Sequence, residues 1–348
     1  MMKQKVLFVD YTYQKGHVNF NRIHIDAIKA AGYDVDIVLH SEIAASLGYP
    51  VEDYVLKLPN CLRQRDNSPI LNRMVYIIIL LWIKIKVLRF SKYAHVVVSS
   101  CDEPTLGLLP LCRNMYIMCH NTASVYSKVK RFFLRRLSRH NTFLVFDEYM
   151  KAPFLKYGIK NVKIVSHGCV PPFEPCCEEN LPAEMKGFRK AIFHPSSKAD
   201  TSFVESLVTD AKLCEYLQKE GILLLIHGKK DEKWSLSDNI RFISGFLPTE
   251  VYHAVFMKAD VILLAYPSSF QNQVSGVSFE CVANHKNILV REHPALAYCR
   301  DFYNYDPIFS SNEELLQKIM WLTDKTSEYR CVVSAENLAP NYKEIFER

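Results

Sequence analysis

A loop rich in hydrogen-bonding side chains is the segment of this chain best suited to bind a ligand. It runs from residue 266 to residue 276, follows the apolar run 261–265 and precedes a segment, 276–284, with helical spacing. Its side chains are mostly Ser, Asn and Gln, with almost no charge. A strand-to-helix loop presents backbone N–H groups and the positive end of the helix dipole. The sequence therefore predicts that Ser275 and Gly276 help to bind an anion.

The segments that position this loop alternate between expected strands and expected helices. Apolar runs predict strands at 5–9, 35–39, 95–99, 115–118, 142–146, 162–165, 191–193, 222–226, 240–243, 261–265 and 287–290. Helical spacing predicts helices at 19–31, 201–220 and 249–258. Because a strand, a helix and a further strand form the opening unit, we expect doubly wound parallel sheets with ligands at the carboxyl ends of their strands.

At 348 residues, the chain exceeds the size at which one hydrophobic core usually keeps growing, so two domains are expected. The segment 171–182 is rich in Pro and Glu, which is typical of a connection. We therefore expect a Rossmann-like N-terminal domain at 1–172, a linker at 173–190 and a second α/β domain at 191–325. The remaining residues, 326–348, are expected to form a C-terminal helix that packs back toward the first domain.

The two halves of the chain differ in charge. Residues 1–173 contain 24 Lys and Arg against 12 Asp and Glu, whereas the rest contain 19 against 25. Two segments of the first half combine cations with apolar residues, namely the ten apolar residues at 74–83 with flanking Lys and Arg, and the basic amphipathic run 128–139. A core helix and a solvated helix face would explain both, but docking on anionic lipid remains an alternative. Nucleic-acid binding is not expected, since no matching motif accompanies the charge.

Several classes of site are disfavoured by the residues themselves. Only Gly16 stands in the first strand-to-helix loop, 11–19, so the glycine fingerprint of NAD and FAD sites is absent. The 11 Cys are scattered without a CxxC pair, which indicates reduced thiols and neither a zinc site nor a disulfide framework. The Asp34-Val35-Asp36 triplet has the form of a manganese motif, but it begins an expected strand that would place both carboxylates on one exposed side. No metal and no cofactor are therefore expected. The opening residues lack a secretory signal, so a cytoplasmic location is expected.

The order of these segments resembles that of GT-B glycosyltransferases, most closely the family-4 type. That family has, in its second domain, a Pro-Ser loop, a Gly, a helix that begins Glu-Ala-x-Ala and a strand that begins Lys-Pro-x-Val. Here the corresponding residues are Pro267-Ser268, Ser275-Gly276, Glu280 to Ala283 and Lys286 to Leu289. The resemblance implies a GT-B fold, in which two tandem Rossmann-like doubly wound domains face each other across a cleft.

The resemblance also implies roles for individual residues. Glu280 corresponds to the glutamate that holds the donor ribose, and Asn272 stands where the family has a second glutamate near the donor sugar. His120, at the end of the strand 115–118, corresponds to a histidine near the reacting centre. Lys198, with Ser196, would neutralise the donor diphosphate because the family's Gly-Arg is missing; Lys229 and Lys230 are an alternative source of charge. Gly245 and Phe246 correspond to a loop that contacts the base, while Gly16 and His17 border the crevice. The segment 161–168 resembles the family's Asn-Gly end of the first domain, with His167 departing from it.

The implied activity is transfer of a sugar from a nucleoside diphosphate sugar to an acceptor, with retention of configuration and without a metal. The expected acceptor is a lipid-linked saccharide of a surface polysaccharide, and the expected place is the cytosolic face of a membrane. A GT-B epimerase or phosphorylase and a non-catalytic nucleotide-sugar-binding scaffold remain alternatives. The pyridoxal type of phosphorylase would need a far longer chain.

Overall fold

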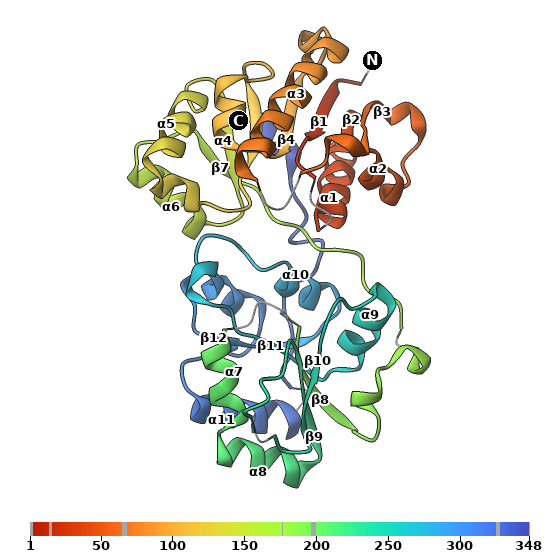
Figure 1. Ribbon diagram of the computed structural model, residues 1–348, viewed down its shortest axis with the longest axis vertical. Coiled ribbons are helices and arrows are strands. Elements are labelled where there is room, and N and C mark those ends of the chain that lie inside the picture. Colours follow the sequence, from red (N-terminus) through yellow and green to blue (C-terminus); the bar gives the residue numbers. More distant parts are fainter. Residues whose placement is uncertain are drawn as a thin grey trace. The chain divides into compact units, whose positions relative to one another are not determined.

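The computed structural model describes residues 3–13, 16–64, 68–175, 177–195, 200–234, 236–324 and 328–347. It divides the chain into two compact units (Figure 1). Unit 1 takes in the residues up to Gly168, the short segment Asn272–Val274 and the residues from Leu338 onward. Unit 2 takes in Cys169–Gln271 and Ser275–Asn337. The expected linker, 173–190, belongs to unit 2, where Met185 is buried.

Unit 1 consists of one parallel sheet with helices around it (Figure 1). Its strands are β1 (Lys5–Asp10), β2 (Asp34–His40), β3 (Tyr54–Leu58), β4 (His95–Ser100), β5 (Met115–Met118), β6 (Thr142–Val145) and β7 (Val162–Ile164). Its helices are α1 (His17–Ala30), α2 (Ser41–Leu47), α3 (Pro69–Val87), α4 (Glu103–Leu108), α5 (Lys128–Leu137), α6 (Glu148–Lys156) and α12 (Tyr342–Glu347).

The strand order in unit 1 is β3-β2-β1-β4-β5-β6-β7, and every neighbouring pair is parallel. The continuous apolar runs of β1 and β4 are explained by burial, since Val6 to Val9 have no exposed surface and Val97 and Val98 have none either. The chain proceeds to one side of β1 through β2 and β3 and to the other side through β4. The carboxyl ends of β1 and β4 therefore form the switch point at which such sheets bind ligands.

Unit 2 has the same plan with fewer strands. Its strands are β8 (Lys190–His194), β9 (Ile222–His227), β10 (Ile240–Ile243), β11 (Val261–Leu264), β12 (Asn287–Arg291) and β13 (Ile308–Phe309). Its helices are α7 (Thr201–Val208), α8 (Ala211–Glu220), α9 (Thr249–Lys258), α10 (Gly276–Ala283) and α11 (Asn312–Asp324), with a long 3-10 helix at Pro294–Phe302. The sheet order is β10-β9-β8-β11-β12-β13, again all parallel, so β8 and β11 flank the switch point.

Several elements differ from the expectations. The strands β3 and β13 were not expected, because their sequences, YVLKL and IF, are too short to show a clear apolar run. The expected helix at 201–220 is two helices, α7 and α8, with a break before Ala211. Asp210 explains the break, since its side chain accepts from the Leu213 amide at 3.0 Å and so caps the start of α8.

The C-terminal segment packs on unit 1 through α12. The Tyr342 hydroxyl lies 2.8 Å from Nδ1 of His24 on α1, and both side chains are fully buried. Phe346 stacks on His95 with ring centroids 4.0 Å apart, and Lys163 donates to the Ile345 carbonyl at 2.7 Å. The helix covers only Tyr342–Glu347 of the expected 326–348.

Candidate functional site

A cavity of about 570 Å³ opens at the carboxyl ends of β1, β4 and β5 in unit 1. It lies at the switch point of the sheet, where ligands of doubly wound folds bind. Hydroxyls, carboxyls, imidazoles and a lysine line it. Its lining residues include Thr12, His17, Ser100, Asp102, Glu103, His120 and Lys130.

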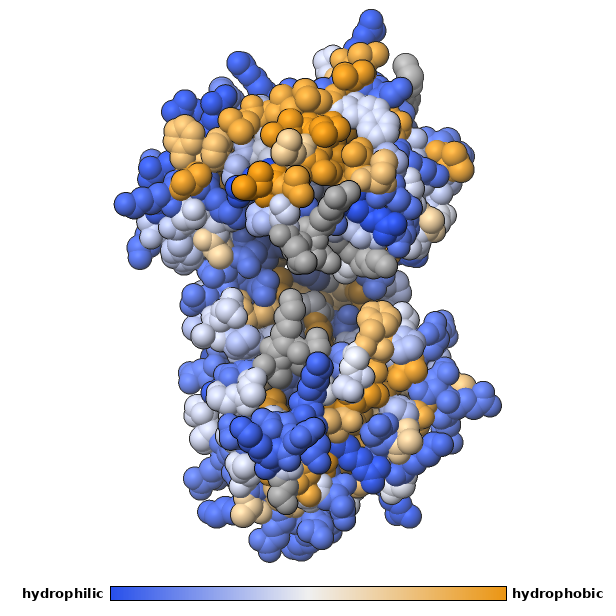
Figure 2. Space-filling model, viewed as in Figure 1, coloured by the Kyte–Doolittle hydropathy of each residue, from blue (hydrophilic) through white to orange (hydrophobic). Residues whose placement is uncertain are grey.

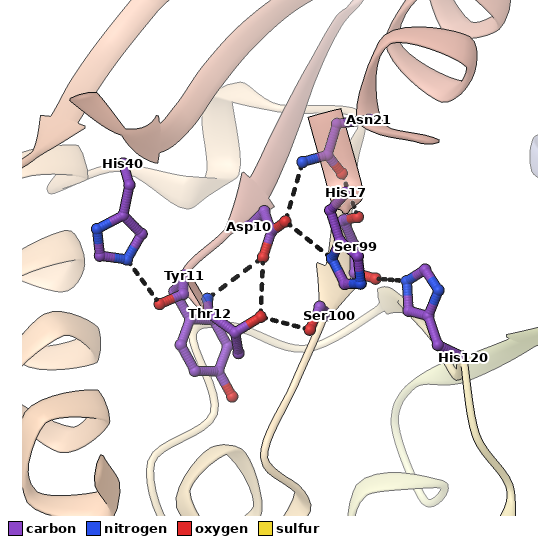
Figure 3. Close-up of polar contacts among 9 residues, drawn as sticks. All are labelled: Asp10, Tyr11, Thr12, His17, Asn21, His40, Ser99, Ser100 and His120. Carbon is purple, nitrogen blue, oxygen red and sulfur yellow. Dashed lines mark hydrogen bonds and ion pairs between the residues drawn. The ribbon is translucent and has the colours of Figure 1, made fainter. Parts of the chain in front are cut away.

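Asp10, the last residue of β1, is the centre of a buried polar network beside this cavity (Figure 3). Its Oδ2 accepts from Nδ2 of Asn21 at 2.9 Å and lies 3.4 Å from Nδ1 of His17. Its Oδ1 accepts from the amide and the hydroxyl of Thr12, at 3.3 and 3.2 Å. Burial raises the pKa of the Asp10 carboxyl, but its interactions with His17 and the hydrogen bond from Asn21 outweigh this effect, so the pKa is lowered and the carboxylate stays ionised.

His120 follows β5 and faces His17. Its Nε2 lies 2.8 Å from the Ser99 carbonyl, and because a carbonyl only accepts, Nε2 carries the proton (Figure 3). Its ring stacks on that of His17 with centroids 4.4 Å apart and an angle of 22° between planes. Burial, with the neighbouring charge of His17, lowers the pKa of His120 to about 3, so His120 is neutral at pH 7.

His167 belongs to an aromatic cluster that also contains His120. Phe20 lies between it and His120, with ring centroids 5.3 and 4.4 Å away respectively, and Phe146 packs beside it at 5.4 Å. Burial lowers the pKa of His167 to about 4. His167, which stands where the family has the Asn of Asn-Gly, therefore packs within an aromatic cluster.

A second cavity, of about 390 Å³, lies in unit 2 at the carboxyl ends of β9 and β10. Trp234 and Phe242 form an aromatic wall, with ring centroids 5.7 Å apart, and Lys229 and Thr201 supply polar groups. An aromatic wall with few polar groups is suited to a planar ring such as a nucleobase. Trp234 was not among the predicted site residues, because its loop has no periodicity that would have marked it.

Solved structures share this architecture. A glycosyltransferase from Rickettsia africae aligns with a TM-score of 0.58 and 14% identity, over 99% of this chain and 92% of that chain. A trehalose-6-phosphate protein from E. coli with bound UDP-2-fluoroglucose aligns with a TM-score of 0.63 and 10% identity, over 99% and 95%. The fold is that of the GT-B glycosyltransferases. No protein-family model and no curated protein sequence matches the chain.

The GT-B fold alone does not specify the reaction. A UDP-N-acetylglucosamine 2-epimerase aligns almost as well, with a TM-score of 0.57 and 10% identity over 99% of this chain and 96% of that chain. The chemistry is therefore set by the side chains that this chain places on the GT-B scaffold.

Glu280, which the resemblance assigns to the donor ribose, lies on α10 in unit 2. Its Oε2 accepts from the Tyr252 hydroxyl of α9 at 2.6 Å. Burial raises the pKa of the Glu280 carboxyl, and the hydrogen bond from Tyr252 limits this rise. Tyr252 thus holds the orientation of the carboxylate, a role that the sequence did not reveal.

The start of α10 is built differently from what the polar loop indicated. The Ser275 hydroxyl caps the helix by accepting from the Ser278 amide at 3.4 Å, and the Ser275 amide donates to the Tyr298 hydroxyl at 3.1 Å. Because that amide is already bound, an anion at this helix start would meet the next amides, beginning at Gly276, which is exposed.

Asn272 is grouped with a different unit from Ser275 and Glu280, which belong to unit 2. It belongs to unit 1, where its carbonyl accepts from the Thr122 amide at 2.9 Å and from the Thr122 hydroxyl at 3.3 Å. Its side chain is nearly buried. Asn272 is therefore in the same unit as His17 and His120.

In unit 2, Gly245 lines the second cavity and its carbonyl lies 2.9 Å from Nε2 of His227. Its φ of 87° is in the region that favours glycine. Phe246 follows it and is 91% exposed, so its ring is available to a ligand. Gly16 precedes α1 in unit 1 and is exposed. Lys198 and Ser196 lie outside the described residues.

The Asp-x-Asp triplet is a structural ion-pair site. Asp34 is exposed, but Asp36 is buried, contrary to the expectation that both face solvent. Asp36 contacts Lys5 at 3.0 Å and Lys92 at 3.4 Å, and accepts from the Tyr93 hydroxyl at 2.8 Å. Two lysines and a phenol leave no need for a cation at this carboxylate. Within the described ranges, no three His, Cys, Asp or Glu side chains are grouped as metal ligands.

Proposed function

We propose that this protein is a glycosyltransferase that moves a sugar from a nucleoside diphosphate sugar to an acceptor hydroxyl. Two cavities support this proposal most directly, because each unit has one cavity at the carboxyl edge of its sheet. The aromatic cavity of unit 2 suits a nucleobase, and the polar cavity of unit 1 suits a hydroxylated acceptor. The bound UDP-2-fluoroglucose of the E. coli relative of this fold supports a uridine diphosphate sugar as the donor.

On unit 2, Trp234 would stack on the base and Glu280 would accept hydrogen bonds from the ribose hydroxyls. The diphosphate would be neutralised by Lys229, by Lys198 and by the amides at the start of α10. Fixed positive charge of this kind stabilises the leaving nucleoside diphosphate without a metal ion. The family-4-like subtype and a lipid-linked saccharide acceptor in polysaccharide synthesis are the finer parts of the proposal.

Binding of sugar nucleotides tests the donor assignment. Thermal unfolding is measured with UDP-, GDP-, ADP- and CMP-sugars, since a ligand bound only by the folded state raises the melting temperature. We expect one nucleotide to raise it and the same sugar nucleotide to release nucleoside diphosphate when acceptors are added. Failure of every nucleotide to shift the unfolding temperature would overturn the proposal.

An epimerase is the second candidate, favoured by the solved epimerase of the same fold. The two reactions differ in their need for an acceptor. Incubation of the binding sugar nucleotide without acceptor, followed by proton NMR, would show an epimerised donor in the one case and a hydrolysed donor in the other. Binding without either product would identify a non-catalytic nucleotide-sugar-binding protein.

We further propose that unit 1 docks on an anionic membrane through the outward face of α3. Seven large apolar side chains on and just after this 19-residue helix are exposed: Ile70, Leu71, Met74, Ile78, Leu81, Ile85 and Leu88. Their spacing of three or four residues places most of them along one side, about 28 Å long. Figure 2 shows apolar residues gathered over α3 on this face of unit 1.

Basic residues border this apolar face, as an anionic surface requires. Lys86 and Arg89 lie at the end of α3, and α4 packs against both α3 and α5. On α5, Phe132 is 62% exposed among the exposed Lys128, Arg135 and Arg136. Cations around an apolar stripe fit a helix that lies in the headgroup region. No helix among the described residues has both the length and the apolarity to cross a bilayer.

Sedimentation with lipid vesicles tests the docking proposal. We expect binding to vesicles of phosphatidylcholine with phosphatidylglycerol, weaker binding to phosphatidylcholine alone, and loss of binding at high salt. Ile78→Gln with Ile85→Gln should weaken binding, whereas the exposed Val332→Gln of unit 2 is the matched control. Equal binding of wild type and the double variant would overturn the docking proposal. If the same face instead formed a dimer, the protein would have a larger mass in solution.

A further inference from the structure

His227, the last residue of β9, lies between the loops that follow the two neighbouring strands of unit 2. Its Nδ1 lies 2.9 Å from the carbonyl of Pro195, the residue after β8. Its Nε2 lies 2.9 Å from the carbonyl of Gly245, two residues after β10. Because β9 has β8 on one side and β10 on the other, this one ring bridges three adjacent strand ends.

The two contacts of this ring depend on its protonation. A carbonyl oxygen only accepts hydrogen bonds, so each ring nitrogen must carry a proton to bond its partner. A neutral imidazole has one N–H, whereas the imidazolium has two. The neutral ring would therefore bond one carbonyl and point the lone pair of its other nitrogen at the second. Only the protonated ring of His227 satisfies the carbonyls of Pro195 and Gly245 together.

The groups around His227 influence which form its ring takes. His194, the last residue of β8, is neutral at pH 7 because burial lowers its pKa to about 4. Lys229 lines the same cavity as His227, and its positive charge opposes a second charge on the ring. Thr201 of α7 and Phe242 of β10 also line this cavity and are uncharged. The two carbonyls favour the imidazolium and Lys229 disfavours it, so an anionic ligand that offsets the lysine charge favours uptake of the proton.

This bridge also shapes the cavity of about 390 Å³ in unit 2. His227 and Gly245 both line that cavity, together with its aromatic wall. Gly245 has a φ of 87°, so the loop after β10 turns at the carbonyl that the ring holds, next to the exposed Phe246. A ring that loses one of its two protons releases one of the two loops. The protonation of His227 therefore determines whether both loops beside the cavity are fixed.

We infer that His227 is a positioning residue of the nucleotide site in unit 2 and that nucleotide binding there is coupled to uptake of a proton by its ring; this rests on the proposed donor role of that cavity. Neither ring nitrogen contacts the ligand, because carbonyls hold both. The imidazolium instead fixes the two loops and adds a positive charge that attracts the diphosphate. By linkage, affinity for an anionic nucleotide rises as the pH falls, by at most about tenfold per pH unit for one proton.

Isothermal titration with the sugar nucleotide that binds best, beginning with UDP-glucose, tests the coupling. The phosphates of a sugar nucleotide are diesters, so they do not titrate near neutral pH as a terminal phosphate does. Titration at pH 7 in buffers that differ in ionisation enthalpy counts the protons taken up on binding. We expect wild type to take up more protons than His227→Gln, and its dissociation constant to be about 3- to 30-fold lower at pH 6.5 than at pH 8.

The comparison with His227→Gln isolates the ring, because both proteins carry Glu280 and exchange the same protons there. His285→Asn is the control: it replaces an exposed histidine of unit 2 whose φ of 51° asparagine tolerates, and it should take up as many protons as wild type. Equal proton uptake by wild type and His227→Gln would overturn the inference and leave the donor assignment standing. Failure of every sugar nucleotide to bind would overturn both.

NMR of wild-type protein with ¹⁵N-labelled histidine tests the bridge without a variant that could misfold. A ring N–H that is held by a carbonyl exchanges slowly with water and gives a signal, whereas that of an exposed histidine such as His285 is lost by exchange. In the ligand-free protein, we expect both ring N–H signals of His227 at pH 6 and only one at pH 8. UDP-glucose added at pH 7 should strengthen the second signal. A single N–H signal at pH 6, or a second signal that UDP-glucose leaves unchanged, would overturn the inference.

Discussion

His120 lies against His17 with ring centroids 4.4 Å apart, so two imidazoles share one wall of the cavity in unit 1. Burial keeps His120 neutral at pH 7. The resemblance placed His120 near the reacting centre and His17 at the border of the crevice, and the fold stacks the two rings on each other. The ring that the carboxylate of Asp10 orients is that of His17.

Stability should fall in mild acid because of the buried histidines. The pKa of His167 is about 4 in the folded protein, below its ordinary value of 6.5, so the unfolded chain binds a proton that the folded chain does not. The loss therefore begins as the pH falls below about 6.5 and continues toward 4, at up to about 1.4 kcal/mol per pH unit. His167→Asn should reduce this slope by about one proton in urea unfolding between pH 7 and pH 5. The exposed His140→Gln should leave the slope unchanged, and an equal slope in His167→Asn would contradict the prediction.

Trp234→Ala should weaken nucleotide binding. If the base stacks on the indole, the loss is about 1–3 kcal/mol, the usual range for stacking of a base on an aromatic side chain. Isothermal titration with UDP should then give a dissociation constant roughly 5- to 150-fold higher. Trp321→Ala, which changes an exposed tryptophan on α11, is the control. Unchanged affinity in Trp234→Ala would indicate that the base binds in another part of unit 2.

Tyr252→Phe should alter the pH dependence of donor binding. The Tyr252 hydroxyl donates to Glu280 and lowers the pKa of that carboxyl, which burial raises. Without this donor the pKa of Glu280 rises further, so the carboxylate that accepts from the ribose becomes protonated at a higher pH. Affinity for UDP, measured from pH 8 to pH 5, should therefore begin to fall at a higher pH in Tyr252→Phe than in wild type. In Glu280→Gln, the affinity should be low throughout, and a wild-type profile in Tyr252→Phe would count against Glu280 as the ribose ligand.

Tyr342→Phe should destabilise unit 1 although it changes one atom near the C-terminus. The hydroxyl bonds to Nδ1 of His24, and both residues are fully buried, so the variant leaves a buried ring nitrogen without this partner. The cost of such a group is about 1–3 kcal/mol. Urea unfolding measures it, with the exposed Tyr126→Phe as the control. Equal stability of the two variants would show that α12 is held by its apolar contacts, such as that of Phe346 with His95.

The pattern of apolar and polar residues along the chain was sufficient to predict most of the fold. Runs such as Val6 to Val9 and Val96 to Val98 consist of apolar, mainly β-branched residues, and they satisfy both the hydrophobic effect and strand geometry only inside a parallel sheet. Their alternation with helical segments was enough to predict two doubly wound sheets. Ser275 was likewise predicted at the start of a helix, because a polar N-cap is a property of neighbouring residues.

Contacts between residues from distant segments of the chain determine the geometry and charge of the site. Asp10 ends an apolar strand and shows no sign in the sequence that His17 and Asn21 hold its carboxylate, because both approach it only when α1 packs on the sheet. In the sequence, Asp36 has the form of half of an exposed motif. In the fold, Lys5 and Lys92 lie beside it and form ion pairs with its carboxylate. Residue type and spacing determine which side chains can carry chemistry, whereas burial and charge partners, which set their protonation and direction, depend on elements brought together by the fold.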